Sequence, residues 1–263
     1  TNRCQDSMLL CIDIGNTNTD LGLFQADRLL VHQKMPTRSG ESASFYRERL
    51  RSLLAPHLRD ELLTGTVVGS VVADLDAILL RACQPLCNGP ILQVGADWDL
   101  GLTIAYDLPE AVGIDRLLAA AAARSRLSRN CGLIIADAGT AITVDAVDAD
   151  GTFLGGLILP GLHLGLDALH GGTSLLPRID LNPRAPLLGK NTLAGMQAGA
   201  LHGSTAQLDG LFDRIATRLG GPVAGFLTGG DARFLQFGAT RYSHCNPALV
   251  LHGLHLAFSR RTG

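Results

Sequence analysis

One pattern occurs twice in this chain and constrains its fold more than any other feature. Residues 8–24, MLLCIDIGNTNTDLGLF, place an apolar run before Asp13, a Gly-Asn-Thr turn, and a second apolar run that ends at Phe24. Residues 131–148, CGLIIADAGTAITVDAVD, repeat this order around Asp137. Each copy is typical of a strand, a tight polar turn and an antiparallel strand. Two such copies predict two similar lobes.

The remaining apolar patterns supply further elements for both lobes. We expect helices over residues 42–54, 74–87, 116–127, 193–218 and 249–259, and strands over residues 66–72, 91–94, 152–159 and 224–230. No Ser/Gly/Pro-rich linker separates the two copies, so we expect closely packed lobes with a hinge near residues 124–130. We therefore assign residues 8–125 to an N-terminal lobe and residues 126–263 to a C-terminal lobe, with residues 1–7 as an extension outside the fold.

Composition excludes several classes of protein. With 263 residues, 46% hydrophobic and 17% charged, the chain is long and apolar enough to bury a core. A formal net charge of -2 supplies no basic field for nucleic acid or an anionic membrane. The longest helix-like apolar run, residues 117–123, is far shorter than the roughly 20 residues of a membrane span. The six cysteines lack C-x-x-C spacing, which favours buried thiols in a reducing cytoplasm over a zinc site or disulfides.

Polar turns follow three of the expected strands. Residues 13–19, DIGNTNT, offer backbone N–H groups and hydroxyls to an anion, and Asp13 is a candidate ligand for a hydrated Mg²⁺. Residues 137–145, DAGTAITVD, place Thr143 and Asp145 on one side of a strand. Residues 228–231, TGGD, form a glycine turn that lets a bulky ligand approach the backbone. Taken singly, each turn is equally consistent with an ordinary hairpin or αβ turn.

An acidic and a basic residue also meet at the start of the alanine-rich helix. Asp115 precedes Arg116 at the end of the segment YDLPEAVGIDR, residues 106–116. A carboxylate there can accept a proton from a hydroxyl, and a guanidinium can bind a substrate carboxylate. In isolation, the simpler interpretation is an acidic residue favoured by the helix dipole next to a surface arginine.

The order of these turns resembles the acetate/sugar kinase, heat-shock chaperone and actin superfamily. That resemblance implies an α/β fold with two ribonuclease-H-like lobes, each a mixed sheet with flanking helices, together with two phosphate loops and a later adenosine loop. More narrowly, the chain resembles type III pantothenate kinase. The matching motifs are D-x-G-N-T at 13–17, Y-x-x-P-x-x-V-G-x-D-R at 106–116, D-x-G-T-A-x-T-x-D at 137–145, G-G-x-I-x-P-G at 155–161, T-[SA]-x-L-P at 173–177, G-K-x-T…M-Q-x-G at 189–199 and T-G-G-D at 228–231.

This resemblance implies ATP-dependent phosphorylation of pantothenate, the first step of coenzyme A synthesis, with Asp115 as the general base. It implies that Asp137 binds K⁺ or NH₄⁺, and that Thr173 reaches pantothenate across a homodimer interface. The residues implied for ATP are Asp13, Ile14, Gly15, Asn16, Thr17, Asn18, Thr19, Asp20 and Thr140; those implied for pantothenate are Tyr106, Gly113, Ile114, Asp115, Arg116 and Thr173.

One position departs from the family pattern. Asp20 lies where similar proteins carry an apolar or small residue, and a second carboxylate near the phosphates would repel them. We expect strand alternation to turn Asp20 outward.

Three other functions compete with the kinase assignment. A regulatory protein on the same fold would have no physical need for Asp13, Asp115, Asp137 and Thr140 together. A kinase of another hydroxy acid or sugar would not need the segment 106–116, which matches the pantothenate branch. A nucleic-acid-binding protein would carry a basic patch, and the near-neutral charge argues against it.

Overall fold

The computed structural model describes residues 7–58, 62–95, 97–127 and 130–263, which form two compact units. The first unit comprises the described residues up to Gly101, Leu108–Ala122 and Val250–Gly263, and the second comprises Leu102–Asp107 and Ala123–Leu249. Of the expected N-terminal extension, residues 1–6 lie outside the described residues. Ser7 belongs to the fold, because its carbonyl accepts a hydrogen bond from the Ala26 N–H at 3.3 Å. The expected hinge includes residues 128–129, which also lie outside the described part.

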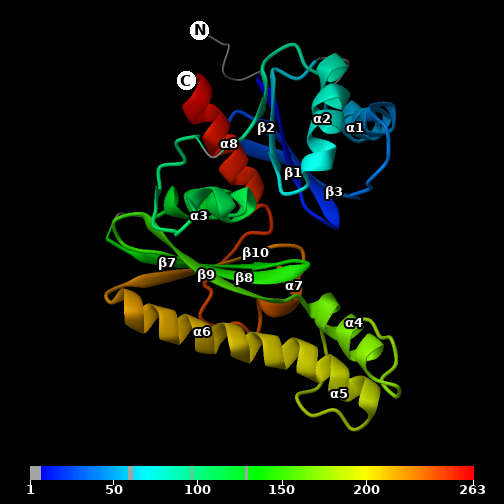
Figure 1. Ribbon diagram of the computed structural model, residues 1–263, viewed down its shortest axis with the longest axis vertical. Coiled ribbons are helices and arrows are strands. Elements are labelled where there is room, and N and C mark those ends of the chain that lie inside the picture. Colours follow the sequence, from blue (N-terminus) through cyan, green and yellow to red (C-terminus); the bar gives the residue numbers. More distant parts are fainter. Residues whose placement is uncertain (1–6, 59–61, 96, 128–129) are drawn as a thin grey trace. The chain divides into compact units, whose positions relative to one another are not determined.

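The first unit contains a mixed sheet flanked by helices (Figure 1). Its strands run in the order β3-β2-β1-β4-β5, with β1–β2 and β2–β3 antiparallel and β1–β4 and β4–β5 parallel. The strands are β1 (Met8–Ile14), β2 (Asn18–Gln25), β3 (Arg28–Pro36), β4 (Gly65–Ser70) and β5 (Ile91–Gln93). The helices are α1 (Ala43–Leu58), α2 (Ala73–Cys83), α3 (Ile114–Arg124) and α8 (Leu249–Thr262). The last two residues of α3 and the first residue of α8 group with the second unit.

The second unit repeats this topology and adds one edge strand. Its sheet has the order β11-β10-β7-β8-β9-β6, so β9-β8-β7-β10-β11 corresponds to the first sheet strand by strand. The strands are β6 (Thr103–Ile104), β7 (Gly132–Ala138), β8 (Ala141–Val147), β9 (Thr152–Pro160), β10 (Val223–Thr228) and β11 (His244–Cys245). The helices are α4 (Leu162–Gly172), α5 (Thr192–Ala198), α6 (Ser204–Leu219) and α7 (Ala232–Leu235). The duplicated hairpin predicted from residues 8–24 and 131–148 is therefore confirmed.

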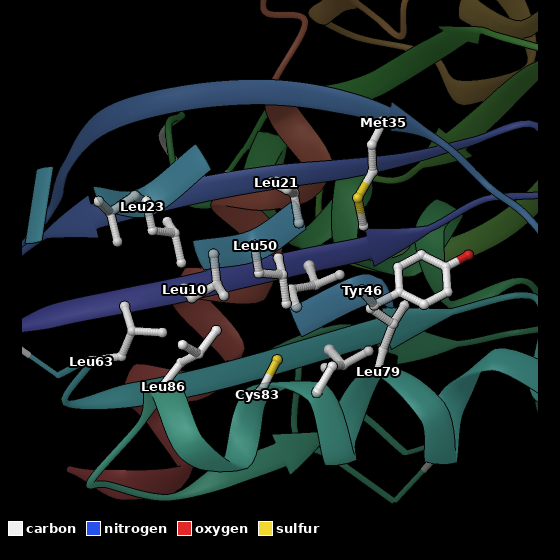
Figure 2. Close-up of a cluster of buried hydrophobic side chains, with 14 of the residues drawn as sticks. Leu10, Leu21, Leu23, Met35, Tyr46, Leu50, Leu63, Leu79, Cys83 and Leu86 are labelled. Atoms are coloured by element: carbon white, nitrogen blue, oxygen red, sulfur yellow. The ribbon is translucent and has the colours of Figure 1, made fainter. Parts of the chain in front are cut away.

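Alternation along β1 divides the first sheet into two faces. Leu10 and Ile12 are fully buried beneath α1 and α2, where Leu50 and Leu79 pack in the same cluster (Figure 2). Tyr46 of α1 is also fully buried, and its hydroxyl donates to the Arg38 carbonyl at 2.8 Å, so the one polar atom of this ring is satisfied.

The opposite face of the first sheet is covered by α3 and α8. Leu118 of α3 and Leu254 of α8 both lie over Gly69 of β4. The two helices meet at Gly253, where a Cβ atom would lie 2.2 Å from the Leu118 carbonyl oxygen. The assignment of residues 126–263 to one lobe is thus wrong for α8, because this helix buries its apolar face on the first sheet. It is also wrong for residues 102–107, whose strand β6 pairs with β9 of the second sheet.

The core of the second unit lies between its sheet and α6 (Figure 1). Ile134 and Val144 of the hairpin are buried with Leu208 and Phe212 of α6. The sequence predicts one helix over residues 193–218. The structure instead has α5, a π-helical turn at Gly199–Gly203 and then α6. Such a turn accommodates one extra residue in a helix, and the three glycines at 195, 199 and 203 weaken the regular α-helix here.

The cysteine thiols of the described residues are unpaired; Cys11 and Cys83 are buried as expected, but Cys87 and Cys131 are only partly buried and Cys245 is exposed. Cys83 is buried in the first core, and burial together with the nearby Cys87 raises its pKa to about 12. Burial also raises the pKa of Cys11 well above its ordinary value. No helix within the described ranges is long and apolar enough to cross a membrane.

Candidate active site

The first polar turn joins β1 to β2 at the edge of the sheet. Gly15 N–H donates to the Asn18 carbonyl at 3.0 Å and closes the turn, and the side chains of Asn16, Thr17 and Asn18 are exposed. Ile14 is fully buried, and its carbonyl accepts a hydrogen bond from the Val71 N–H at 3.1 Å, so this residue is closed to a ligand. The turn therefore presents backbone and small polar groups to solvent, which is the chemistry that a phosphate requires.

Thr37, at the end of β3, fixes this turn and was not identified from the sequence. Its N–H donates to the Thr17 carbonyl at 3.0 Å, and its hydroxyl donates to the Gly15 carbonyl at 2.7 Å. The hydroxyl of Thr19, which is fully buried, lies 3.0 Å from the Thr37 hydroxyl. No pattern in the sequence points to this role, because the role depends on the pairing of β3 with β2.

Asp20 does not turn away from Asp13, so that expectation is wrong. The two residues lie directly opposite each other in the β1–β2 register and therefore share one face of the sheet. The Asp20 carboxylate contacts two side chains of β3, with Oδ1 at 2.7 Å from His32 Nε2 and 3.2 Å from Lys34 Nζ.

Asp115 lies in the first turn of α3. Its Oδ1 accepts a hydrogen bond from the Arg116 N–H at 2.9 Å, and the carboxylate folds back over Gly113, where a Cβ would lie 2.5 Å from Oδ1. A helix N-terminus favours a carboxylate at this position. Ile114 begins the helix, and the Arg116 side chain is only 9% exposed. The residue pair expected from the sequence is thus fixed at the start of α3.

Two further residues implied for pantothenate belong to the second unit. Tyr106 follows β6, and its ring lies against Gly155 of β9, where a Cβ would be 3.2 Å from the ring. Gly155 has a φ of +98°, which suits a residue without a side chain. Thr173 ends α4 and is exposed, and its hydroxyl donates to the Leu169 carbonyl at 2.8 Å.

Three turns of the second unit pack closely against one another, because glycines stand at the points of contact. A Cβ on Gly161 would lie 2.2 Å from the Gly139 carbonyl oxygen and 2.4 Å from that of Thr140. A Cβ on Gly229, whose φ is +91°, would lie 2.3 Å from Asp137 Oδ1. The Asp231 N–H donates to the Ala138 carbonyl at 2.9 Å. The structure therefore brings the expected turns at 137–140 and 228–231 together, along with the P-G segment that precedes α4.

The surroundings of Asp137 fit a hard cation with oxygen ligands. Asp137 ends β7 and is paired in register with Thr228 of β10 and Thr143 of β8. The Thr228 hydroxyl is buried and has no hydrogen-bond partner, so an oxygen donor stands unused beside this carboxylate. Carboxylate, hydroxyl and carbonyl oxygens are the ligands of alkali and alkaline-earth ions. Within the described ranges no three His, Cys, Asp or Glu side chains gather as a metal site.

His163 is a further residue whose place the sequence did not reveal. It lies in the first turn of α4, and its Nε2 is 3.6 Å from Asp231 Oδ1. In the sequence, the one noticeable feature of His163 is its seven-residue spacing from His170, and that spacing does not identify the residue that His163 contacts. The His170 ring instead contacts the Leu176 carbonyl at 2.8 Å, so the two histidines share a helix and have separate contacts.

Comparison with known sequences decides the family. A family model described as type III pantothenate kinase matches residues 9–214. The chain belongs to the type III pantothenate kinase family. A relative of that name from Myxococcus xanthus (strain DK1622) is 35% identical over 254 residues, which cover 96% of this chain and 98% of the relative. Another from Solibacter usitatus (strain Ellin6076) is 32% identical over 254 residues, covering 96% of this chain and 97% of the relative.

Solved structures agree on the fold of this family member. A chain from Campylobacter jejuni, named for the Baf family of transcriptional activators, aligns with a TM-score of 0.58 at 19% identity and covers 96% of this chain and 98% of its own length. Component A of the (R)-2-hydroxyglutaryl-CoA dehydratase of Acidaminococcus fermentans aligns with a TM-score of 0.54 at 14% identity, covering 96% of each chain. At these identities the likeness shows the fold alone, and it agrees with the expected architecture of two mixed sheets with flanking helices.

The close packing of the three turns predicts that one added methyl group at Gly161 lowers the stability of the protein. Gly161→Ala would force its Cβ into two carbonyl oxygens, so we expect the free energy of unfolding to fall by about 1–3 kcal/mol. We also expect ATP binding to weaken, because the turn at 137–140 must shift. The control is Gly210→Ala in α6, where the Cβ would meet nothing within 4 Å and where we expect about 0.5–1 kcal/mol of stabilisation. Urea unfolding and ATP titration measure both effects; equal stabilities of the two variants would contradict the packing argument.

Proposed function

We propose that this chain transfers the γ-phosphoryl group of ATP to the primary hydroxyl of pantothenate, giving 4'-phosphopantothenate in the first step of coenzyme A synthesis. The observation that carries the proposal is the match to named type III pantothenate kinases over 96% of the chain. The polar turns, the Asp115–Arg116 pair and the Asp137 surroundings support it, because each offers the chemistry that this reaction needs. We also propose a cytoplasmic location, which the unpaired thiols support.

Each proposed residue has a defined task. Backbone N–H groups of the turn at residues 15–18 and the turn at Thr140 bind ATP phosphates. Asp115 Oδ1 accepts a hydrogen bond from the Arg116 N–H, which leaves Oδ2 for the substrate. Oδ2 accepts the hydroxyl proton of pantothenate as that hydroxyl attacks the γ-phosphorus. Arg116 binds the carboxylate of pantothenate. Most of the rate gain then comes from positioning the hydroxyl and from donors aimed at developing negative charge.

Two cations complete the proposal. Asp137, with the Thr228 hydroxyl and neighbouring carbonyl oxygens, holds K⁺ or NH₄⁺, which supplies positive charge at the second-unit turn. Asp13 is the candidate ligand for Mg²⁺, which reduces the negative charge of the phosphates. A single protein carboxylate is a common arrangement for Mg²⁺ bound with a nucleotide.

A non-catalytic regulatory protein is the alternative. One neighbouring structure is named for a family of transcriptional activators, but at 19% identity that likeness carries only the fold. The chain keeps Asp13, Asp115, Asp137 and Thr140, for which a regulatory protein would have no chemical need.

The reaction can be tested directly. We expect ADP release from ATP and Mg²⁺ that depends on pantothenate and collapses when Na⁺ replaces K⁺, because the proposed cation at Asp137 is K⁺ or NH₄⁺. A coupled ADP assay measures this. Turnover that is equal in both salts would remove the monovalent cation from the proposal. A folded protein that shows no turnover in either salt would favour the regulatory alternative.

The role of Asp115 has its own test. Asp115→Asn removes the proton acceptor while keeping the hydrogen bond to the Arg116 N–H through the amide oxygen. We expect kcat to fall about 10²–10⁴-fold, with the Kd for ATP unchanged within about twofold. The matched control is Glu110→Gln, an exposed carboxylate five residues earlier, which should keep its kcat. Undiminished turnover of the Asp115 variant would remove the base assignment.

We propose a homodimer, in which Thr173 of each subunit contributes to the other subunit's pantothenate site. The support is a set of exposed apolar side chains in the segment 158–188, which contains Thr173. Leu175 is 90% exposed, Leu188 is 82% exposed and Ile158 is 67% exposed. A cavity of about 500 Å³ between α4 and α5, lined in part by Leu166, lies in the same region. Monomers rarely leave such apolar surface in water.

If the protein is a homodimer, one substitution at the proposed interface should halve its mass in solution. We expect Leu175→Asp to give a monomer in size-exclusion chromatography with light scattering, because a carboxylate cannot be buried in an apolar interface. Phe237→Asp is the control, since Phe237 is 88% exposed but lies outside the segment 158–188. A wild-type protein of monomer mass, or a Leu175 variant that remains dimeric, would contradict the proposal.

A further inference from the structure

One row of charged side chains crosses the first sheet at the level of Asp13. In the strand register Asp13 is opposite Asp20, and Asp20 is opposite Lys34. Residues paired in this way project from the same face of the sheet, and His32, two residues before Lys34, shares that face. The row lies next to the turn at residues 15–18. Two carboxylates and one ammonium group therefore stand side by side where the proposed function places ATP phosphates.

The contacts within the row assign Lys34 to Asp20. Lys34 Nζ and His32 Nε2 both approach the same oxygen of Asp20, at 3.2 and 2.7 Å. The Asp20 side chain is 17% exposed and Lys34 is 38% exposed, so the pair is partly withdrawn from water. A partly buried carboxylate beside another carboxylate is costly unless an opposite charge accompanies it. Lys34 supplies that charge, and His32 supplies a hydrogen bond in the tautomer that carries the proton on Nε2.

The second unit contains the same row with different residues, and it serves as an internal comparison. There Asp137 is opposite Thr143, and Thr143 is opposite Ile158. This row has no carboxylate at the position of Asp20 and no cation at the position of Lys34. The cation thus occurs in the copy that carries the additional carboxylate. This pattern is expected if Lys34 compensates Asp20, and it has no reason to occur if Lys34 is an ordinary surface lysine.

We propose that Lys34 is a positioning residue of the phosphate turn, and that it sets ATP affinity by cancelling the charge of Asp20. The inference rests on the proposed function, because it takes the turn at residues 15–18 to bind phosphates. Asp20 then contacts Lys34 and His32 in place of ATP. Strand β3 contributes twice, since Thr37 fixes the shape of the turn and Lys34 adjusts its charge.

The test is a double-substitution cycle read out by ATP binding. Lys34→Met leaves Asp20 uncompensated, so we expect the Kd for ATP, measured by calorimetry, to rise about tenfold, the size of one unit charge at a partly screened site. The KM for ATP should rise equally, while kcat and the KM for pantothenate stay within about twofold. Asp20→Val in the same chain removes the excess charge, so the double variant should recover the wild-type Kd within about twofold. Lys34→Arg keeps the charge and should bind ATP as the wild type does.

Controls separate charge from structure. Arg51→Met removes one partner of an exposed ion pair with Glu48 on α1, at 3.5 Å, and should leave the Kd for ATP unchanged. A merely structural role of Lys34 predicts that the double variant binds ATP no better than Lys34→Met, and that result would overturn the inference. An unchanged Kd in Lys34→Met would overturn it too, as would a wild-type protein that binds no ATP. A wild-type protein that binds ATP but does not phosphorylate pantothenate defeats only the proposed function.

Discussion

The turn between the first two strands of each sheet lies partly in solvent and yet holds its shape, and the rest of the structure depends on how this is achieved. A buried turn could rely on apolar packing, but an exposed one cannot. In the first unit Thr37 reaches across from β3 and bonds to the carbonyls of Gly15 and Thr17. In the second unit Gly161 and Gly229 let neighbouring backbone close in on residues 137–140. In both turns the glycine N–H is bonded within the turn, from Gly15 to the Asn18 carbonyl and from Gly139 to the Ala141 carbonyl.

The two copies have kept one topology and diverged in chemistry. Five strands in the same order place an aspartate at the same strand end in both sheets. Next to Asp13 the row contains a second carboxylate and a lysine, whereas next to Asp137 it contains the neutral hydroxyl side chains Thr143 and Thr228. Duplication therefore fixed where the carboxylates stand, and the neighbours on the adjacent strands determine what each carboxylate can bind.

Much of this could be predicted from the sequence, because the hairpins have strong local signals. Apolar runs that end at Asp13 and Asp137, followed by glycine turns, define both strand pairs without any knowledge of the tertiary structure. The sequence did not reveal β3 or α4. Strand β3 lies at a sheet edge and has a half-polar sequence, RLLVHQKMP, whose alternation is weak. Helix α4 contains three glycines, at 165, 171 and 172, which lower its helical propensity, and a fourth, Gly161, is its N-cap.

The role of Asp20 shows why register, unlike strand position, could not be derived. The β2–β3 pairing shifts by one residue between Leu23 and Phe24, next to a turn in which Ala26 adopts a φ of 48°. A one-residue slip moves every side chain of a strand to the other face of the sheet. Without that bulge, Lys34 and His32 would point away from Asp20, and the carboxylate would stand beside Asp13 with no opposite charge. The irregularity at one end of the hairpin thus determines the electrostatics at the other end, next to the turn at residues 15–18.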